Sequence, residues 1–336
     1  MSQEQGDVLL IGSVGLEDTE AVFRTLAKEL GNKATRYPDG ETGERGFWIV
    51  WQHKFMAANK NLVVENNRFR PRDGLGTEDL TFDNIGYADA ALESWEVFRR
   101  LKAEGVIGKD IRFQISLPTP AAVVSLFVQP DHCTTVEPAY EAAMIKEMGR
   151  IMEGIPAEEL AIQWDVCLEI LAFDEAAGVP MFYEEVLEGT MERLARLNTH
   201  LPESVEMGVH LCYGDPGHKH IKEPESALSS VLFCNAMART IKRRVDWMHF
   251  PCPKDRNDDA YYKPLEKLDI PKETRLYIGL VHYTDGHDGT MDRVSLARKY
   301  VKDFGVATEC GFGRRERSTI PKLLKIHTDV VGTMHR

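Results

Sequence analysis

The chain has 336 residues, of which 43% are hydrophobic and 28% are charged, as is typical of a soluble globular protein with one large α/β domain or two smaller ones. Its net charge of −12, from 41 basic and 53 acidic residues, argues against nucleic acid as a partner. No apolar run approaches the roughly 20 residues of a membrane span, and the polar first residues lack signal-peptide features, so we predict a cytoplasmic protein without membrane contact.

Short β-branched runs alternate with longer segments of helical periodicity, which is typical of a parallel sheet covered by helices. The predicted strands are Val8–Ile11, Ala34–Tyr37, Arg112–Leu117, Leu160–Val166, Val205–Leu211, Val245–Phe250, Leu276–Val281 and Gly305–Thr308. The predicted helices lie near Leu16–Leu30, Tyr87–Glu104, Val136–Glu153, Phe182–Asn198, Ser226–Arg243, Met291–Asp303 and Ile320–His327.

Eight such units predict a (β/α)₈ TIM barrel that forms a single catalytic domain over residues 1–336, with a doubly wound open sheet as the alternative. The segment Thr42–Arg72 is long for a connection between a strand and a helix. We interpret it as an extended loop after strand two, inserted at the catalytic face.

In such barrels the catalytic residues follow the C-terminal ends of the strands. Reactive side chains do gather directly after most of the predicted strands. In chain order the candidates are Ser13, Asp39, Glu41, Arg45, Asp165, Glu169, His210, Cys212, Tyr213, Cys252, His282 and Cys310.

Three of these candidates predict a zinc site. His210 and Cys212 are two residues apart on one strand, so both side chains point to the same side of it. Cys310, at another strand end, can supply a third ligand, and three protein ligands with an open fourth position are typical of catalytic zinc. The alternative is a packed histidine beside buried free cysteines. The remaining cysteines, Cys133, Cys167 and Cys234, are interpreted as packing residues.

Other candidates are expected to contact the substrate. Arg36 and Arg45 could hold a carboxylate or phosphate, and Asp39 and Glu41 share the loop with Arg45; a turn with solvated charges is the alternative. Asp165 and Glu169 are candidates for acid–base or orienting roles. His282 could take part in a proton relay or a second metal site, or belong to a polar loop, and Tyr213 is grouped with the substrate-binding residues.

Four pieces of the sequence resemble the catalytic barrel of cobalamin-independent methionine synthase and its stand-alone relatives in the uroporphyrinogen-decarboxylase-like group. They are Ile11-Gly12-Ser13, Gln163-Trp164-Asp165, His210-Leu211-Cys212-Tyr213 and Cys310-Gly311-Phe312-Gly313-Arg314-Arg315. The resemblance implies a zinc ion held by His210, Cys212 and Cys310, and a thiol substrate that is alkylated at sulfur. It also implies that Ser13 and Asp165 contact the amino-acid part of that substrate.

The sequence also departs from this family. The usual fourth zinc ligand, a glutamate at the end of strand six, is absent from Trp247–Pro253, where Cys252, His249 or a water could replace it. The tryptophan that stacks on the folate donor is absent from 117–128, and the chain has one barrel where the full-length synthase has two. Stand-alone barrels of this type resemble enzymes that take methyl groups from a corrinoid protein or alkylate other thiols.

We therefore predict a zinc-dependent thiol S-alkyltransferase, in the first place a methyltransferase of the methionine-synthase type. Its expected partners are a small-molecule thiol acceptor and a methyl or alkyl donor, with a corrinoid protein as one candidate donor. The alternative is a lyase or decarboxylase of the same barrel group, which acts on an anionic small molecule without stoichiometric metal. The sequence predicts neither the two substrates nor the oligomeric state.

Overall fold

The main sheet contains seven parallel strands in the order β1-β4-β5-β6-β7-β8-β9. The structure is a computed structural model that describes residues 6–179, 181–217 and 219–335. Each strand matches a predicted one to within two residues at either end. The bounds are β1 Arg36–Pro38, β4 Arg112–Pro118, β5 Leu160–Val166, β6 Glu206–Leu211, β7 Trp247–Pro251, β8 Arg275–Val281 and β9 Gly305–Thr308.

The remaining predicted strand, residues 8–11, is not a regular strand. The Leu9 N–H donates to the Val306 carbonyl at 3.0 Å on one side, and the Val14 N–H donates to the Gly40 carbonyl at 2.8 Å on the other. Only isolated bridges form along this segment, and glutamine side chains of β4 and β5 donate to its carbonyl oxygens. The segment thus runs between β9 and β1, with part of its backbone bonded to side chains instead of a continuous ladder.

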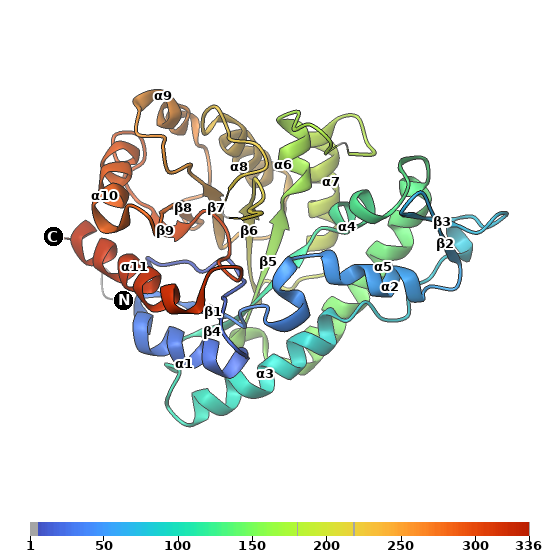
Figure 1. Cartoon of the computed structure of the whole chain (residues 1–336), viewed down its shortest axis with the longest axis horizontal. Helices are drawn as coiled ribbons and strands as arrows, with labels where there is room; N and C mark the ends of the chain where they lie inside the picture. The colour runs from blue at the N-terminus through green and yellow to red at the C-terminus, as the bar shows by residue number, and fades with distance from the viewer. Residues whose placement is uncertain (1–5, 180, 218, 336) are drawn as a thin grey trace.

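Seven long helices surround the sheet, which lies in the centre of Figure 1. They confirm the seven predicted helices with shifted ends: α1 Thr19–Leu30, α3 Tyr87–Ala103, α5 Cys133–Gly154, α7 Val186–Asn198, α8 Leu228–Thr240, α10 Gly286–Ala297 and α11 Ile320–Met334. Helix α1 illustrates the pattern, since it buries Val22, Phe23, Leu26 and Leu30 on one face. Within the described part of the chain, no helix combines the length and apolar character needed to cross a membrane.

The sequence did not predict four short helices: α2 His53–Ala58, α4 Pro120–Phe127, α6 Leu168–Phe173 and α9 Asp259–Tyr262. Single 3₁₀ turns occupy Gly31–Lys33, Gly43–Phe47, Val50–Gln52, Thr77–Asp79, Pro130–His132, Ala157–Glu159, Lys263–Lys267 and Arg317–Thr319. The long segment after β1 is folded: it contains two of these turns, α2 and an antiparallel hairpin of β2 Leu62–Glu65 and β3 Arg68–Pro71. Figure 1 shows this hairpin at the opposite edge of the molecule from the two termini.

Arg36 lies at the N-terminal end of the sheet, which corrects its predicted role as a substrate-binding residue. Its guanidinium stacks 4.1 Å from the ring centroid of Trp247 and pairs with Glu206 at 2.6 Å. Trp247 fills the space inside the sheet, where Gly208 leaves no Cβ to oppose the indole. Because Arg36, Glu206 and Trp247 are the first residues of their strands, this pair stabilises the end opposite to the strand ends that carry the reactive side chains.

Candidate functional site

A cleft opens at the C-terminal ends of the strands and encloses about 1070 Å³, counting its mouth. Six of the predicted site residues line this cleft: Ser13, Glu41, Asp165, His210, Cys212 and Cys310. Its mouth carries exposed apolar side chains, among them Phe47 from the segment after β1 and Ile221 from the segment after β6. The architecture therefore brings together residues that are up to 300 positions apart, as the contact between Ser13 and Gly313 illustrates: the Gly313 N–H donates to Ser13 Oγ at 3.2 Å.

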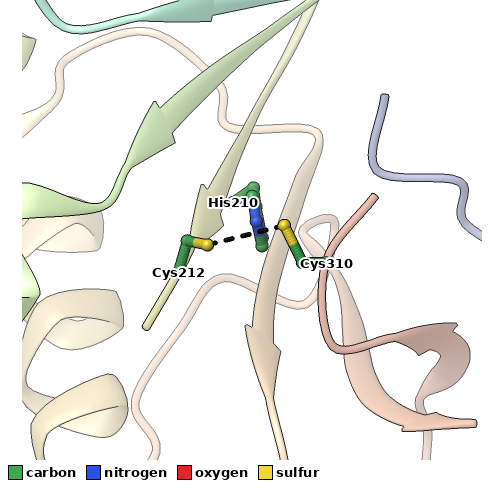
Figure 2. Close-up of side chains that lie close together, drawn as sticks. All are labelled: His210, Cys212 and Cys310. Atoms are coloured by element: carbon green, nitrogen blue, oxygen red, sulfur yellow. Dashed lines mark hydrogen bonds between the residues drawn. The ribbon is translucent and has the colours of Figure 1, made fainter. Parts of the chain in front are cut away.

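His210, Cys212 and Cys310 all line the cleft, and Figure 2 shows their side chains close together. One ligand atom from each residue lies within 4.8 Å of the others, and the two sulfur atoms are 3.6 Å apart. His210 lies on β6, Cys212 follows that strand directly, and Cys310 follows β9. This is the only such group of histidine, cysteine and carboxylate side chains among the described residues.

A hydrogen-bonded pair of histidines fixes the tautomer of His210. His249 Nε2 lies 3.1 Å from the carbonyl oxygen of Thr308, which can only accept, so this nitrogen carries the proton. His249 Nδ1 is then an acceptor for the Nδ1–H of His210, at 2.8 Å. Burial keeps both rings neutral, since it lowers the pKa of His249 to about 3 and holds that of His210 well below its usual value.

The consequence is a free lone pair on His210 Nε2. This buried atom has no hydrogen-bond partner among the described residues, and a buried nitrogen without a partner is costly. The neighbouring Cys167 thiol raises the pKa of Cys212 and burial adds to the rise, although the hydrogen bond with Cys310 opposes it. The Cys212 thiol and burial in turn raise the pKa of Cys310. A cation would relieve both conditions, so one imidazole nitrogen and two sulfurs fit a zinc ion in donor type and arrangement.

The end of β7 does not supply the fourth ligand that the sequence suggested. The Cys252 Sγ lies 2.9 Å from the hydroxyl of Tyr262, outside the cluster. Both ring nitrogens of His249 are occupied by Thr308 and His210. The predicted metal role of Cys252 is therefore corrected, and His249 acts instead by orienting His210, as outer partners of metal-bound histidines commonly do.

Two carboxylates, Glu41 and Asp165, face the cleft beside this cluster and also line a smaller cavity behind it. Burial raises the pKa of Glu41, and the nearby Asp165 carboxylate raises it further. Burial also raises the pKa of Asp165, although hydrogen bonds from Gln163 and Trp48 oppose the rise. Two buried acids with raised pKa values are poised to accept a positively charged group, which would restore their ionised forms.

An ion pair between Asp39 and Arg45 supports these two carboxylates. Arg45 pairs with Asp39 at 2.7 Å, and the Ser94 hydroxyl donates to the same carboxylate oxygen at 2.8 Å. The other oxygen of Asp39 accepts the Glu41 N–H at 2.9 Å. Because Glu41 has a φ of 47°, unusual for a non-glycine residue, this bond holds its backbone in an otherwise unfavourable conformation.

Two cleft residues were not assigned a role from the sequence. Trp48 has a φ of 52° and donates a hydrogen bond to Asp165, so its strained backbone places an indole against a site carboxylate. Arg314 donates to the Gly46 carbonyl at 3.4 Å and to the carboxylate of Asp215 at 3.0 Å. It thereby joins the two loops on either side of the cleft. The Cys310–Arg315 motif pointed to Arg314, whereas a tryptophan inside an irregular insertion gave no signal.

Three further candidates lie outside the cleft lining. Glu169 is fully buried on α6, where the Thr119 hydroxyl donates to it. The Tyr213 hydroxyl donates to Asp174 at 2.6 Å and is turned away from the cleft. His282 donates from Nε2 to the Cys252 carbonyl at 3.0 Å. The structure thus does not bring these three to the predicted catalytic or substrate-binding positions, because each is engaged by a neighbouring element.

Comparison with solved structures supports the fold. The chain aligns with a B12-independent methionine synthase from Shewanella sp. W3-18-1, solved in complex with selenomethionine, with a TM-score of 0.65 and 13% identity over 98% of both chains. It also aligns with a provisionally assigned vitamin B12-independent methionine synthase from Listeria monocytogenes, with a TM-score of 0.58 and 13% identity over 94% of this chain and 86% of that one.

No protein-family model and no curated protein matches the sequence. The structural likeness therefore establishes a shared fold, and it agrees with the family suggested by the sequence motifs. What this chain does must be argued from its own site.

Proposed function

We propose that the chain is a zinc-dependent S-alkyltransferase of the methionine-synthase type that transfers a methyl group to a small thiol in the cytoplasm. The observation that carries the proposal is the convergence of His210, Cys212 and Cys310, together with a His210 Nε2 that has no hydrogen-bond partner among the described residues. A zinc ion held there would lower the pKa of a substrate thiol and thus favour its nucleophilic thiolate form.

The residues around the cluster have roles that follow from their chemistry. Glu41 and Asp165 would bind the ammonium group of an amino-acid thiol, and the Ser13 hydroxyl, which faces the same cleft, would contact its polar end. The Shewanella protein with this fold binds selenomethionine, an amino acid that carries such an ammonium group. The donor of the methyl group would enter through the apolar mouth, either as a small molecule or on a corrinoid protein.

Residues 7–14 complete the proposed architecture. Residues 7–14 are hydrogen-bonded to β9 on one side and to the segment around β1 on the other. We infer that this segment takes the eighth position of a closed TIM barrel. The lyase or decarboxylase alternative has less support, because Arg36 lies at the opposite end of the sheet and Arg45 is paired with Asp39.

Elemental analysis of the purified chain tests the metal site. We expect about one zinc per chain in the wild type and its loss in Cys310→Ser and His210→Ala. Cys234→Ser, which alters a buried cysteine on α8, should keep the metal. Zinc-loaded protein should then methylate an amino-acid thiol when supplied with candidate donors. A wild-type protein that binds no stoichiometric zinc would contradict the proposal.

A further inference from the structure

Cys167, interpreted from the sequence as a packing residue, lies beside the zinc-binding cluster. It is the first residue after β5, and Cys212 is the first residue after β6. These parallel strands pair Val166 with Leu211, and the Cys212 N–H donates to the Val166 carbonyl at 3.1 Å. The register therefore places Cys167 next to Cys212, with both side chains on the same side of the sheet.

The contact between the two thiols is direct. A hydrogen bond joins Cys167 to Cys212, and both side chains line the same cleft. Cys212 Sγ is also 3.6 Å from Cys310 Sγ, so Cys212 contacts cysteines that follow two other strands, β5 and β9. The remaining cysteines, Cys133, Cys234 and Cys252, do not line this cleft.

The neighbouring elements leave a place for a further ligand. The end of β7 offers none, because His249 is bonded on both ring nitrogens and Cys252 contacts Tyr262. Asp165, which lies on β5 two residues before Cys167, already accepts hydrogen bonds from Gln163 and Trp48. Cys167 is thus the remaining cysteine that lines the cleft beside the cluster. It is not among the three residues whose ligand atoms already lie within 4.8 Å of one another, so its sulfur would join them by rotation about a single torsion angle.

We propose that Cys167 is the fourth protein ligand of the metal centre, which makes the set one histidine and three cysteines. This inference rests on the proposed function, because it requires that zinc binds at His210, Cys212 and Cys310. Three thiolates and one imidazole form a recognised zinc ligand set. Because this set fills all four positions, the substrate thiol of the proposed reaction would displace Cys167 or bind as a fifth ligand. The set also gives a physical reason why the chain has no carboxylate at the end of β7.

X-ray absorption spectroscopy at the zinc edge of the full-length protein measures the ligand set directly. The protein should be loaded with zinc and kept in a phosphine reductant, so that no added thiol supplies sulfur. We expect three sulfur and one nitrogen ligands in the wild type and the loss of one sulfur in Cys167→Ser. Cys234→Ser should retain all three sulfurs and serves as the matched control.

The outcomes separate the two proposals. Zinc bound by two sulfurs in the wild type, with an unchanged spectrum in Cys167→Ser, would overturn the role of Cys167 and leave the three-residue site intact. A wild-type protein that binds no zinc would overturn the proposed function itself. If Cys167→Ser fails to fold, the wild-type sulfur count alone still decides between three cysteine ligands and two.

Discussion

The Nδ1 atoms of His210 and His249 lie 2.8 Å apart inside the sheet, and the second ring nitrogen of His249 is anchored to the Thr308 carbonyl. This arrangement leaves one available lone pair on His210, at Nε2, in a residue whose ring lies close to two cysteine sulfurs. His249 thus occupies the region where the resembled family uses a carboxylate ligand, but it acts through His210. A residue that is not itself a ligand therefore helps to orient a proposed metal ligand.

The first prediction concerns His249. His249→Ala should weaken zinc binding roughly 10- to 100-fold without removing a ligand, because His210 loses the acceptor that fixes its tautomer. Competition with a chromophoric chelator measures this change. His327→Ala provides the control, since His327 is also fully buried and bonded to a backbone carbonyl, on α11. Equal zinc affinity in wild type and His249→Ala would show that the histidine pair has no orienting role.

The second prediction concerns Asp165. Asp165→Asn should raise the KM for an amino-acid thiol roughly 10- to 100-fold, since a charge-assisted hydrogen bond contributes about 1.5–3 kcal/mol. Glu41 and Asp165 must be ionised to bind the ammonium group of the substrate. The affinity for the substrate should therefore rise as the pH passes the raised pKa values of these two carboxylates. Removing the Asp165 charge lowers the pKa of Glu41, and the rise in affinity should therefore begin at lower pH in the variant.

Steady-state kinetics across pH check both effects of Asp165→Asn. Asp131→Asn, at an exposed carboxylate on a 3₁₀ turn, is the control for a change in net charge. An unchanged KM in Asp165→Asn would exclude Asp165 as a binding residue for the ammonium group.

The third prediction concerns Arg314, which bonds Gly46 and Asp215 across the cleft. Arg314→Gln should speed amide hydrogen exchange in residues 43–50 and 213–217 roughly 10- to 100-fold, because bonds from a charged donor contribute about 1.5–3 kcal/mol. Zinc content should stay unchanged while KM rises. Arg317→Gln, which removes an exposed partner of Glu17, is the control. Exchange rates equal to wild type would mean that Arg314 does not join the two loops.

Periodicity predicted eight strands and seven helices, and seven of the strands and all seven helices are confirmed. The signal comes from burial, because α1 buries one regular apolar face and β5 is a continuous buried run. Periodicity did not predict that residues 8–11 bond partly to glutamine side chains, since those contacts join segments more than 100 residues apart. The positions of His210, Cys212 and Cys310 at predicted strand ends correctly predicted that the three residues lie together. Position near a strand end also suggested Arg36, because a short strand places its two ends only a few residues apart in the sequence.

The errors around the site have a common physical cause. A reactive side chain near a strand end can point into the cleft or into the layer beneath the helices, and the partner that decides between them lies elsewhere in the chain. Cys252 is hydrogen-bonded to Tyr262, Tyr213 to Asp174 and Glu169 to Thr119. Cys167 is the opposite case: it was interpreted as a packing residue, but it lines the cleft. The register of β5 and β6, which pairs Val166 with Leu211, places it beside Cys212.

The last prediction concerns Glu169, which is buried at 0% exposure and whose Oε2 has no hydrogen-bond partner in the described part of the chain. Burial raises its pKa to about 7 from an ordinary value of 4.5. The folded protein therefore favours the protonated form of Glu169. As the pH rises from about 4.5 to about 7, the unfolded chain ionises this group first, so the free energy of unfolding falls. Over this window the loss amounts to about 3 kcal/mol, at roughly 1.4 kcal/mol per pKa unit.

Glu169→Gln removes this titration and keeps an oxygen that can accept from Thr119. Its free energy of unfolding should therefore fall less than that of the wild type between pH 4.5 and pH 7, so that the variant gains relative stability at pH 8. Urea unfolding at several pH values measures the difference, with the exposed Glu158→Gln as the control. A constant difference between variant and wild type across this range would show that Glu169 is already ionised in the folded protein.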